Sequence, residues 1–343
     1  MRPTDHRRLG STGLSLTQMG FGGAPLGSMR TIVSDDAAAA TLGAAWAAGI
    51  RYYDTAPWYG RGLSEQRLGS FLKAQPRDQF VLSTKVGRVL RPAGDPAAFD
   101  PAPWAGGLPF EVVFDYSYDG IMRSFEDSLH RLGLTSVDLL LIHDLDSGHH
   151  GQALEAHWAQ LAASGWRALT TLKDSGAISG IGAGINSAGY VARFLEFDID
   201  FFLLASPYTL LDQSALEIEL PLCVDLGVGA VIGAVFNSGI LATGLTDHAQ
   251  YNYGDADHVV LDKVRRLLSV CERHETSLRA AALQFPLGHP SVAAVIPGAF
   301  LPEQLLQNVE DFQRVIPDAF WKDLKSEKLL AENAPVPELA VKR

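Results

Sequence analysis

Short apolar runs alternate along almost the whole chain with longer segments in which apolar residues recur at helical spacing. Gly and Pro residues stand between many of these segments and mark turns. Most of the short runs are apolar throughout, as expected for strands that are buried on both faces of a sheet. The predicted strands are Phe21–Gly23, Ile50–Asp54, Phe80–Thr84, Val137–Ile142, Ile178–Ala183, Phe201–Ala205, Val228–Phe236 and Val292–Ile296.

Predicted helices separate these strands. The first follows Ser34, a residue type that caps helices, carries acids in its first turn and stops before Gly49. The predicted helices are Ser34–Ala48, Ser64–Ala74, Gly120–Leu132, Ala153–Ser175, Ala188–Glu196, Gln213–Leu226 and His258–His274. Eight β/α units of this kind favour a closed (β/α)8 TIM barrel over an open doubly wound sheet. We expect residues 1–343 to form one domain.

Three segments depart from the repeating unit. Two short strands around a Ser-Thr-Gly turn in 8–20 predict a β-hairpin that caps one end of the barrel. Residues 86–118 form a long Pro- and Gly-rich stretch with several aromatics, which indicates a packed lid over the site. The tail from Leu301 predicts one helix ending near Val315 and an extra helix from Pro317 to about Ala331.

Composition and charge narrow the functional class. Hydrophobic residues make up 47% of the 343 residues and charged residues 20%, which is typical of a globular enzyme. The formal net charge of −11 and the lack of a basic stripe argue against nucleic acid as a partner and favour a small-molecule substrate. Because the start is polar and no apolar stretch could span a bilayer, we expect a cytoplasmic protein that is not bound to a membrane. The pattern makes no prediction of oligomeric state.

Four ionisable residues fall at or just after the ends of three successive predicted strands: Asp54, Tyr59, Lys85 and His143. In a parallel barrel these ends converge on one mouth, where catalytic groups are found. A tyrosine exchanges protons slowly near neutrality unless a cation lowers its pKa from about 10. Lys85 is the candidate cation. Each residue alone also fits a structural role, as a cap, a packing aromatic or a structural histidine.

Three motifs around these residues resemble the aldo-keto reductase family. They are Tyr53-Asp-Thr-Ala-Pro-Trp-Tyr-Gly, Ser83-Thr-Lys-Val-Gly and Asp138-Leu-Leu-Leu-Ile-His, in the family's order and on its strands. The resemblance implies that Tyr59 is the general acid/base and that Lys85 and Asp54 set its pKa. It further implies that His143 orients the substrate oxygen. Cys223 and Cys271 lack the spacing of a metal or redox motif, so we expect free buried thiols and no metal site.

The resemblance also implies NAD(P) bound across the barrel mouth without a dinucleotide-binding Gly-x-Gly-x-x-Gly turn. Two departures from the family pattern are Gly184-Ile-Asn186 in place of a Ser-Asn pair and Ala205 or Ser206 in place of a Gln. The stretch from Ile296 to Asp311 contains no Lys or Arg, and Glu303 and Glu310 would repel a 2′-phosphate, which favours NAD over NADP. The implied cofactor-binding residues are Gly22, Asn186, Tyr208, Phe236, Asn237, Ser238, Gly239, Leu241, Gly298, Gln304 and Asn308.

Within the family, the chain looks most similar to NAD-dependent aldose 1-dehydrogenases that act on L-fucose and D-threo-aldoses. Such an enzyme would oxidise the C1 hemiacetal of a sugar to the lactone, with Trp58, Trp104 and Asp144 as substrate-binding candidates. Pyridoxal 4-dehydrogenation, or a general aldehyde and ketone reductase, is an alternative with the same catalytic residues. A non-catalytic redox-sensing subunit that binds a nicotinamide cofactor is an alternative of another class.

Overall fold

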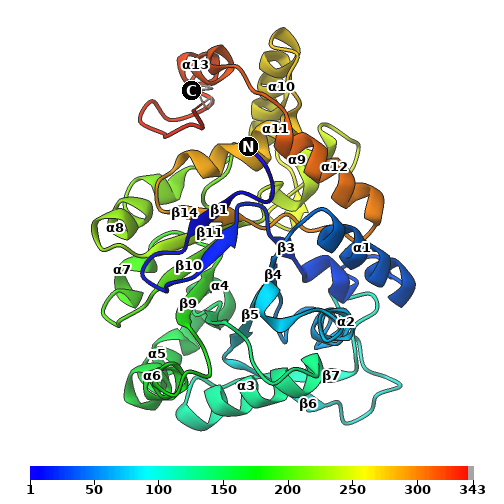
Figure 1. The fold of residues 1–343 in the computed structure, drawn as a ribbon, viewed down its shortest axis with the longest axis vertical. Coiled ribbons are helices and arrows are strands. Elements are labelled where there is room, and N and C mark those ends of the chain that lie inside the picture. Colours follow the sequence, from blue (N-terminus) through cyan, green and yellow to red (C-terminus); the bar gives the residue numbers. More distant parts are fainter. Residues whose placement is uncertain (339–343) are drawn as a thin grey trace.

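Eight parallel strands form the centre of the structure, a computed structural model that describes residues 1–338 (Figure 1). Neighbours in the sheet follow chain order, and parallel bridges from Met19 to Val295 and from Gly22 to Gly298 bring the first strand beside the last. The predicted (β/α)8 barrel is therefore confirmed. The strands are β3 Phe21–Gly22, β4 Tyr52–Asp54, β5 Val81–Val86, β8 Leu139–His143, β9 Gly180–Ile185, β10 Phe201–Ala205, β11 Gly229–Gly233 and β14 Val292–Val295.

The two faces of each strand bury different partners. In β8, Leu139 and Leu141 join a cluster that includes residues of six strands and fills the barrel interior, whereas Leu140 and Ile142 pack in the outer core with the helices. Both faces are therefore apolar, which explains the unbroken apolar runs. Since side chains alternate along a strand, His143 shares the inward face of Leu139 and Leu141. By the same alternation, the side chains of Asp54 on β4 and Lys85 on β5 point into the barrel.

Helices surround the barrel largely as predicted. The Ser34 side chain accepts a hydrogen bond from the Ala37 amide at 3.1 Å and caps the first helix. The predicted helix Ala153–Ser175 is interrupted by a π-helical turn at Leu161–Gly165, and helix α11 was not predicted. The helices are α1 Asp35–Ala47, α2 Leu63–Leu72, α3 Tyr118–Leu132, α4 Ser147–His150, α5 Leu154–Gln160, α6 Trp166–Asp174, α7 Val191–Phe194, α8 Glu219–Asp225, α9 Ile240–Thr243, α10 His258–Arg273, α11 Leu278–Gln284, α12 Pro302–Gln313 and α13 Asp318–Ser326.

The predicted N-terminal hairpin is formed by β1 His6–Arg8 and β2 Ser15–Thr17. Leu9 and Leu16 are fully buried in the cluster of the barrel interior, so the hairpin covers the end at which the parallel strands begin. Gly10 has a positive φ of 47°, and a β-carbon there would lie 2.5 Å from the Gly229 amide nitrogen. The hairpin thus leaves the opposite end of the barrel for the site.

The segment 86–118 is more regular than the expected lid-like loop. Its base is an antiparallel hairpin of β6 Arg88–Pro92 and β7 Phe110–Phe114, and only the residues between these strands are irregular. Trp104 at the tip is fully buried, with its ring centroid 5.6 Å from that of Trp58 and 5.9 Å from that of Tyr59. The segment therefore packs against Trp58 and Tyr59, although its β-structure was not predicted.

Two further predictions concern the cysteines and the membrane. Cys223 and Cys271 are free and buried, as expected. Among residues 1–338, no helix has both the length and the apolar character that crossing a membrane requires.

We predict that Gly69→Ala lowers the free energy of unfolding by about 1–3 kcal/mol, because overpacking a tight contact forces the backbone to move. A β-carbon at Gly69, inside α2, would come 1.9 Å from the Leu132 carbonyl oxygen. The control is Gly43→Ala in α1, where a β-carbon meets nothing within 4 Å. Helix propensity should make that variant more stable by about 0.5–1 kcal/mol. Urea denaturation measures both, and equal shifts would contradict the prediction.

Candidate active site

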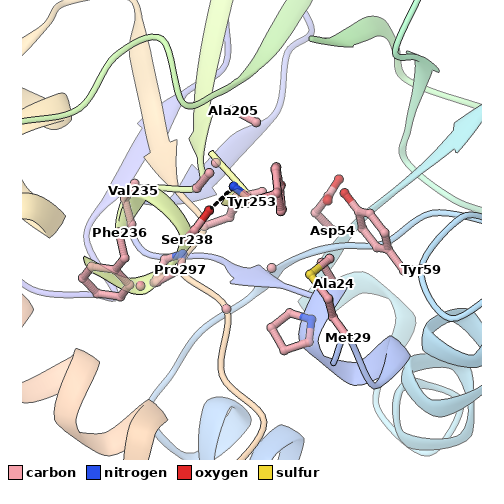
Figure 2. A pocket seen from close by; sticks show the side chains of 18 of the residues that line it. Ala24, Met29, Asp54, Tyr59, Ala205, Val235, Phe236, Ser238, Tyr253 and Pro297 are labelled. Atoms are coloured by element: carbon pink, nitrogen blue, oxygen red, sulfur yellow. Dashed lines mark hydrogen bonds between the residues drawn. The ribbon is translucent and has the colours of Figure 1, made fainter. Parts of the chain in front are cut away.

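A cavity of about 820 Å³ opens at the ends of the strands opposite the hairpin, within the size range of ligand and cofactor sites. Figure 2 shows Asp54 and Tyr59 on one side and Phe236 and Ser238 on the other, with Tyr253 between them in this view. Its walls therefore come from loops that are far apart in the sequence. The cavity brings together all four residues of the predicted catalytic group, Asp54, Tyr59, Lys85 and His143.

A buried ion pair lies at the base of the cavity. The Lys85 ammonium donates to Asp54 Oδ2 at 2.7 Å and to the Thr55 carbonyl at 2.9 Å, and it lies 3.1 Å from the Tyr59 hydroxyl. The side chains of Lys85 and Asp54 are only 1% and 2% exposed. Asp54 Oδ1 accepts from the Ser83 hydroxyl at 2.7 Å. Both carboxylate oxygens of Asp54 and the ammonium of Lys85 are thus engaged within the protein, and the Tyr59 hydroxyl belongs to the same network in the cavity wall.

Tyr59 is held by a turn after β4. The Tyr59 amide donates to the Ala56 carbonyl at 3.1 Å. The next residue, Gly60, has a φ of 65°, and a β-carbon there would lie 2.7 Å from the Gly27 α-carbon. A glycine is required at Gly60 for both reasons. The turn formed by the five residues after Asp54 therefore places Tyr59 next to Lys85 on the neighbouring strand.

The pKa of Tyr59 lies well above its ordinary value, because burial disfavours the phenolate and the charges of Asp54 and Asp144 oppose it. This is the reverse of the lowering expected from Lys85. Burial is the largest cause, and the negative charge of Asp54 beside Lys85 opposes the stabilisation that the lysine alone would give a phenolate. Tyr59 thus carries its proton at neutral pH in this structure.

His143 lies beside Tyr59, with ring centroids 5.9 Å apart and planes perpendicular. Burial, together with the charges of Arg88 and Lys85, lowers the pKa of His143 well below its usual value, so the ring is neutral and has one N–H. Asp144 Oδ2 lies 3.2 Å from His143 Nε2. The carboxylate therefore lies beside a ring nitrogen of His143.

Asp144 is the centre of a second buried charge network. Its carboxylate is paired with the Arg88 guanidinium, and Oδ1 accepts from Asn186 Nδ2 at 2.7 Å. Burial raises the pKa of Asp144, and the charges of Arg88 and His149 oppose that rise. Asp144 also adopts a positive φ of 49°, a conformation that Asp tolerates better than most residues. The network fixes a carboxylate in the cavity wall next to the candidate catalytic histidine.

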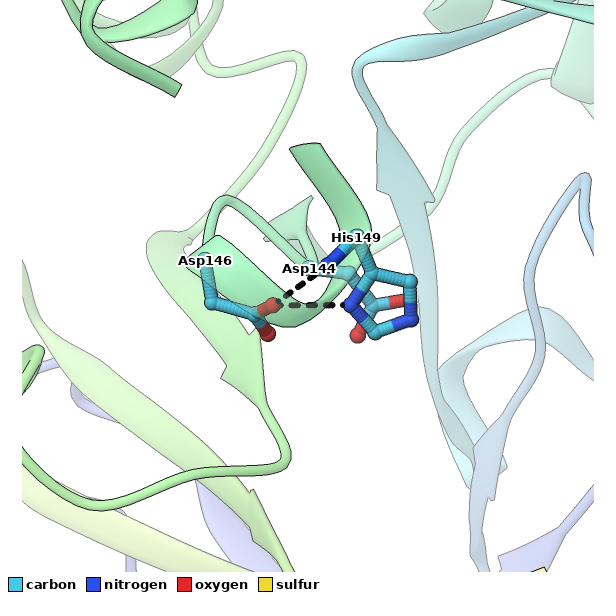
Figure 3. A group of neighbouring side chains, drawn as sticks. All are labelled: Asp144, Asp146 and His149. Atoms are coloured by element: carbon cyan, nitrogen blue, oxygen red, sulfur yellow. Dashed lines mark hydrogen bonds and ion pairs between the residues drawn. The ribbon is translucent and has the colours of Figure 1, made fainter. Parts of the chain in front are cut away.

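Asp144, Asp146 and His149 present potential metal ligands within 4.8 Å of one another (Figure 3). His149 Nδ1 lies 2.9 Å from Asp146 Oδ1, and this hydrogen bond raises the pKa of His149. Arg88 contacts the same Asp144 oxygen that His149 approaches at 3.5 Å. Because a guanidinium already compensates this carboxylate, we interpret the group as an ion-pair network.

Comparisons with known proteins agree with this geometry. Residues 18–328 match the aldo/keto reductase family. The chain is 43% identical over 341 residues to pyridoxal 4-dehydrogenase of Microbacterium luteolum, covering 96% of this chain and 99% of that protein. It is 39% identical over 333 residues to D-threo-aldose 1-dehydrogenase of a Pseudomonas species, covering 93% and 96%. Aldo-keto reductase AKR11C1 from Bacillus halodurans in its holo form superposes with a TM-score of 0.74 at 25% identity, covering 98% of each chain.

The chain belongs to the aldo/keto reductase family. Members of this family are oxidoreductases that use nicotinamide cofactors, and both relatives named above are dehydrogenases. The barrel, the hairpin at its closed end and the cavity at its open end are thus parts of an aldo/keto reductase fold.

The walls of the aldo/keto reductase cavity fit a nicotinamide dinucleotide in two respects. Asn237 is fully buried, lines the cavity and has no hydrogen-bond partner for either side-chain polar atom among the described residues. Asn237, Ser238 and Gly239 all have positive φ, a backbone arrangement that turns successive amides toward an anion. The predicted residues that line the cavity are Gly22, Trp58, Trp104, Asp144, Asn186, Phe236, Asn237, Ser238, Gly239, Gly298, Gln304 and Asn308.

Two predicted cofactor residues do not reach the cavity. Tyr208 is fully buried below the mouth, and its ring centroid lies 5.0 Å from that of Phe285. Leu241 is fully buried in the outer core beneath the loop that contains Asn237. Both residues were predicted from the family resemblance to bind the cofactor. Their side chains point into the core, so the structure does not support that role.

Several cavity residues were not predicted. Tyr253, in the turn between β12 Gln250–Tyr251 and β13 Gly254–Asp255, lines the cavity and donates its amide to Ser238 Oγ at 2.8 Å. Arg30, which also lines it, donates to the Tyr253 carbonyl at 2.6 Å. Arg279 comes from the unpredicted helix α11. No local pattern distinguishes these residues, because the segments that contain them lie apart in sequence from the three motifs.

We predict that Asp144→Asn lowers the free energy of unfolding by about 3–5 kcal/mol, because it leaves the buried Arg88 charge without a counter-charge. The control is Asp262→Asn, which breaks the exposed ion pair with Arg265. Such a pair contributes at most about 1 kcal/mol. Urea denaturation compares the two variants. Equal losses in the two variants would contradict the prediction, because burial would then not increase the contribution of the Asp144–Arg88 pair to stability.

Proposed function

We propose that this chain is an NAD-dependent dehydrogenase that oxidises the C1 hemiacetal of a sugar to the lactone, with aldoses of the L-fucose or D-threo type as substrates. The observation that carries the proposal is the contact of the Tyr59 hydroxyl with the buried Lys85–Asp54 pair, beside His143 and inside the cavity. A titratable hydroxyl in that position is suited to moving a proton at a reacting oxygen.

Tyr59 would act as the general base in the oxidation. Its phenolate accepts the proton of the C1 hydroxyl as that O–H bond breaks, and the C1 oxygen becomes the lactone carbonyl. His143, whose neutral ring has a single N–H, would donate that hydrogen to the same oxygen and hold it in place. Bound NAD would supply the acceptor for the hydride that leaves C1. Lys85 then lies 3.1 Å from the oxygen that gains and loses the proton, while Asp54 keeps the lysine in position.

The cofactor would be held by residues that approach the cavity from three loops. Asn186 donates Nδ2 to Asp144, so its Oδ1 is left to accept from a carboxamide. Asn237 offers both of its polar atoms, and the backbone amides that follow it suit a pyrophosphate. Gln304 accepts the Phe300 amide at 3.1 Å, which leaves its side-chain Nε2 for the adenosine side.

The substrate half of the cavity combines aromatic walls with a fixed carboxylate. Trp58 and Trp104 meet edge to face, and both line the cavity near Tyr59. Asp144 is oriented by Arg88 and Asn186 and faces the same space. Aromatic faces that stack on a ring and a carboxylate that accepts from hydroxyls are the contacts a pyranose would use.

Pyridoxal is the second candidate substrate, favoured by the relative with 43% identity, which is named a pyridoxal 4-dehydrogenase. Pyridoxal can close to an internal hemiacetal, so the same proton and hydride transfers would convert it to a lactone. A reductase of aldehydes or ketones would run the same steps in reverse. A redox-sensing subunit would bind the cofactor and turn over none of these compounds.

The deciding assay follows formation of the reduced cofactor with L-fucose, D-arabinose, L-galactose and pyridoxal, using NAD and NADP in parallel. Oxidation of an aldose with NAD supports the proposal. Oxidation of pyridoxal alone supports the second candidate. Tight cofactor binding without turnover of any substrate would favour the redox-sensing subunit.

We predict that Tyr59→Phe abolishes turnover and changes NAD affinity only slightly, because the substitution removes the proton carrier and retains the ring. Affinity is measured by quenching of tryptophan fluorescence, and turnover by the assay above. Trp58→Phe is the matched control that keeps the hydroxyl of Tyr59, and it should retain turnover with a raised KM. Substantial activity in Tyr59→Phe would remove this residue as the acid/base.

We also predict that the dehydrogenation rate rises with pH from neutral into the alkaline range. The pKa of Tyr59 is raised, so its proton stays bound at neutral pH, and the base form becomes more populated only as pH increases. His143 remains neutral throughout, since its pKa is lowered. Reduction needs the protonated Tyr59 and should not show this rise. An oxidation rate that falls as pH increases would contradict the assignment of Tyr59 as the base.

A further inference from the structure

The far end of the cavity contains a cation that the sequence did not indicate. Arg279, the second residue of α11, lines the cavity, and its guanidinium carbon lies 5.2 Å from the ring centroid of Phe236. Phe236 lies on the side opposite Tyr59 (Figure 2). The segment 296–311 contains no basic residue, but tertiary packing places Arg279 beside Asn308 of that segment.

The donors of Arg279 already have protein acceptors. Its Nε donates to Asp311 Oδ2 at 3.1 Å, and Nη2 donates to Asn308 Oδ1 at 2.5 Å. The Asp311 side chain is only 2% exposed, whereas that of Arg279 is 24% exposed. Asp311 does not line the cavity, so the guanidinium lies between the cavity and a buried carboxylate. Asp311 Oδ1 also lies 3.3 Å from Arg314 Nε, and Arg314 lies 3.6 Å from Glu310, so two arginines and two acids form one compensated group. Arg279 is the member of this group that lines the cavity.

The same contacts fix the orientation of Asn308. A guanidinium has only donors, so the atom of Asn308 that it contacts must be Oδ1. Nδ2 is then the atom left to donate toward the cavity. Asn308 is 1% exposed and lines the cavity, so this orientation is set by α11 and not by solvent. Arg279 thus places a neutral donor where the proposed function puts adenosine.

We propose that Asp311, acting through Arg279, makes this cavity selective for the dinucleotide without a 2′-phosphate. The inference rests on the proposed function in that the cavity binds a nicotinamide dinucleotide. A phosphate that approached Arg279 would compete with Asp311 for the guanidinium and would be repelled by that buried charge. An unmodified ribose brings no such charge and leaves the pair intact. Asp311 and Arg279 are therefore specificity-determining residues, and NAD is the preferred cofactor.

The test measures binding of NAD and NADP by tryptophan fluorescence quenching at one ionic strength, without substrate. Asp311→Asn keeps the shape of the side chain and removes its charge, which frees Arg279 for a phosphate. We expect its affinity for NADP to rise about tenfold, the size of one charge-assisted hydrogen bond, and its affinity for NAD to change little. The double variant Asp311→Asn with Arg279→Gln should lose the gain.

The matched control is Asp318→Asn, which removes a negative charge from the first residue of α13. The Asp318 side chain is exposed, so solvent and salt screen it and the NADP affinity should change no more than about twofold. An equal gain in the two variants would mean that net charge, not the Arg279–Asp311 pair, sets the preference, and would overturn the inference.

Arg279→Gln alone tests the inference if Asp311→Asn does not fold. It removes the arginine of Asp311 that lines the cavity and leaves the carboxylate paired with Arg314 behind it. NADP should therefore lose about tenfold more affinity than NAD. Equal losses for the two dinucleotides would overturn the inference and make Arg279 a purely structural link between α11 and α12. Tighter binding of NADP than NAD by the unmodified protein would also overturn it. Failure to bind either dinucleotide would instead refute the proposed function.

Discussion

The buried ion pair of Lys85 with Asp54 is the interaction on which the site depends. Burying either charge alone would cost several kcal/mol, so each requires the other and the surrounding hydrogen bonds. Asp54 ends β4 and Lys85 lies near the end of β5, two neighbouring strands whose register pairs Asp54 with Ser83. The pair can form only when the barrel has aligned these strands. Catalytic geometry and barrel assembly are therefore coupled through one contact.

Two other buried carboxylates, one in the cavity wall and one behind it, are also paired with arginines. Asp144 is paired with Arg88 near His143, and Asp311 is paired with Arg279 near Asn308. In each case an asparagine is oriented by the pair, Asn186 through its donor and Asn308 through its acceptor. An acidic chain thus lines its cavity with charges that are already compensated. The groups that a ligand would meet are then the two oriented asparagine side chains, with Tyr59 at the end of the cavity where the reaction is proposed.

Local sequence patterns were sufficient to predict the barrel and the four residues that its cavity brings together. Apolar runs located the strands, and alternation along each strand explains why Asp54, Lys85 and His143 share the interior face. The extent of the lid was visible from its Pro, Gly and aromatic residues, but its β6–β7 hairpin was not. The two strands of that hairpin are separated by a loop of irregular residues, and their pairing depends on contacts that no local period encodes.

The sequence by itself determined which residues are candidates for the chemistry, because Tyr59, Lys85 and His143 stand at fixed positions relative to strands that the hydrophobic pattern reveals. Only the tertiary structure decided the electrostatics around them. No sequence motif predicted Arg279 at the cavity, because α11 and α12 meet through packing between segments that are separated along the chain. The expected lowering of the pKa of Tyr59 was reversed for the same reason: burial and neighbouring charges are properties of the fold. The spacing of residues along the chain identifies the candidate residues and their order. The balance of charge around them depends on which distant residues the packing of the fold brings together.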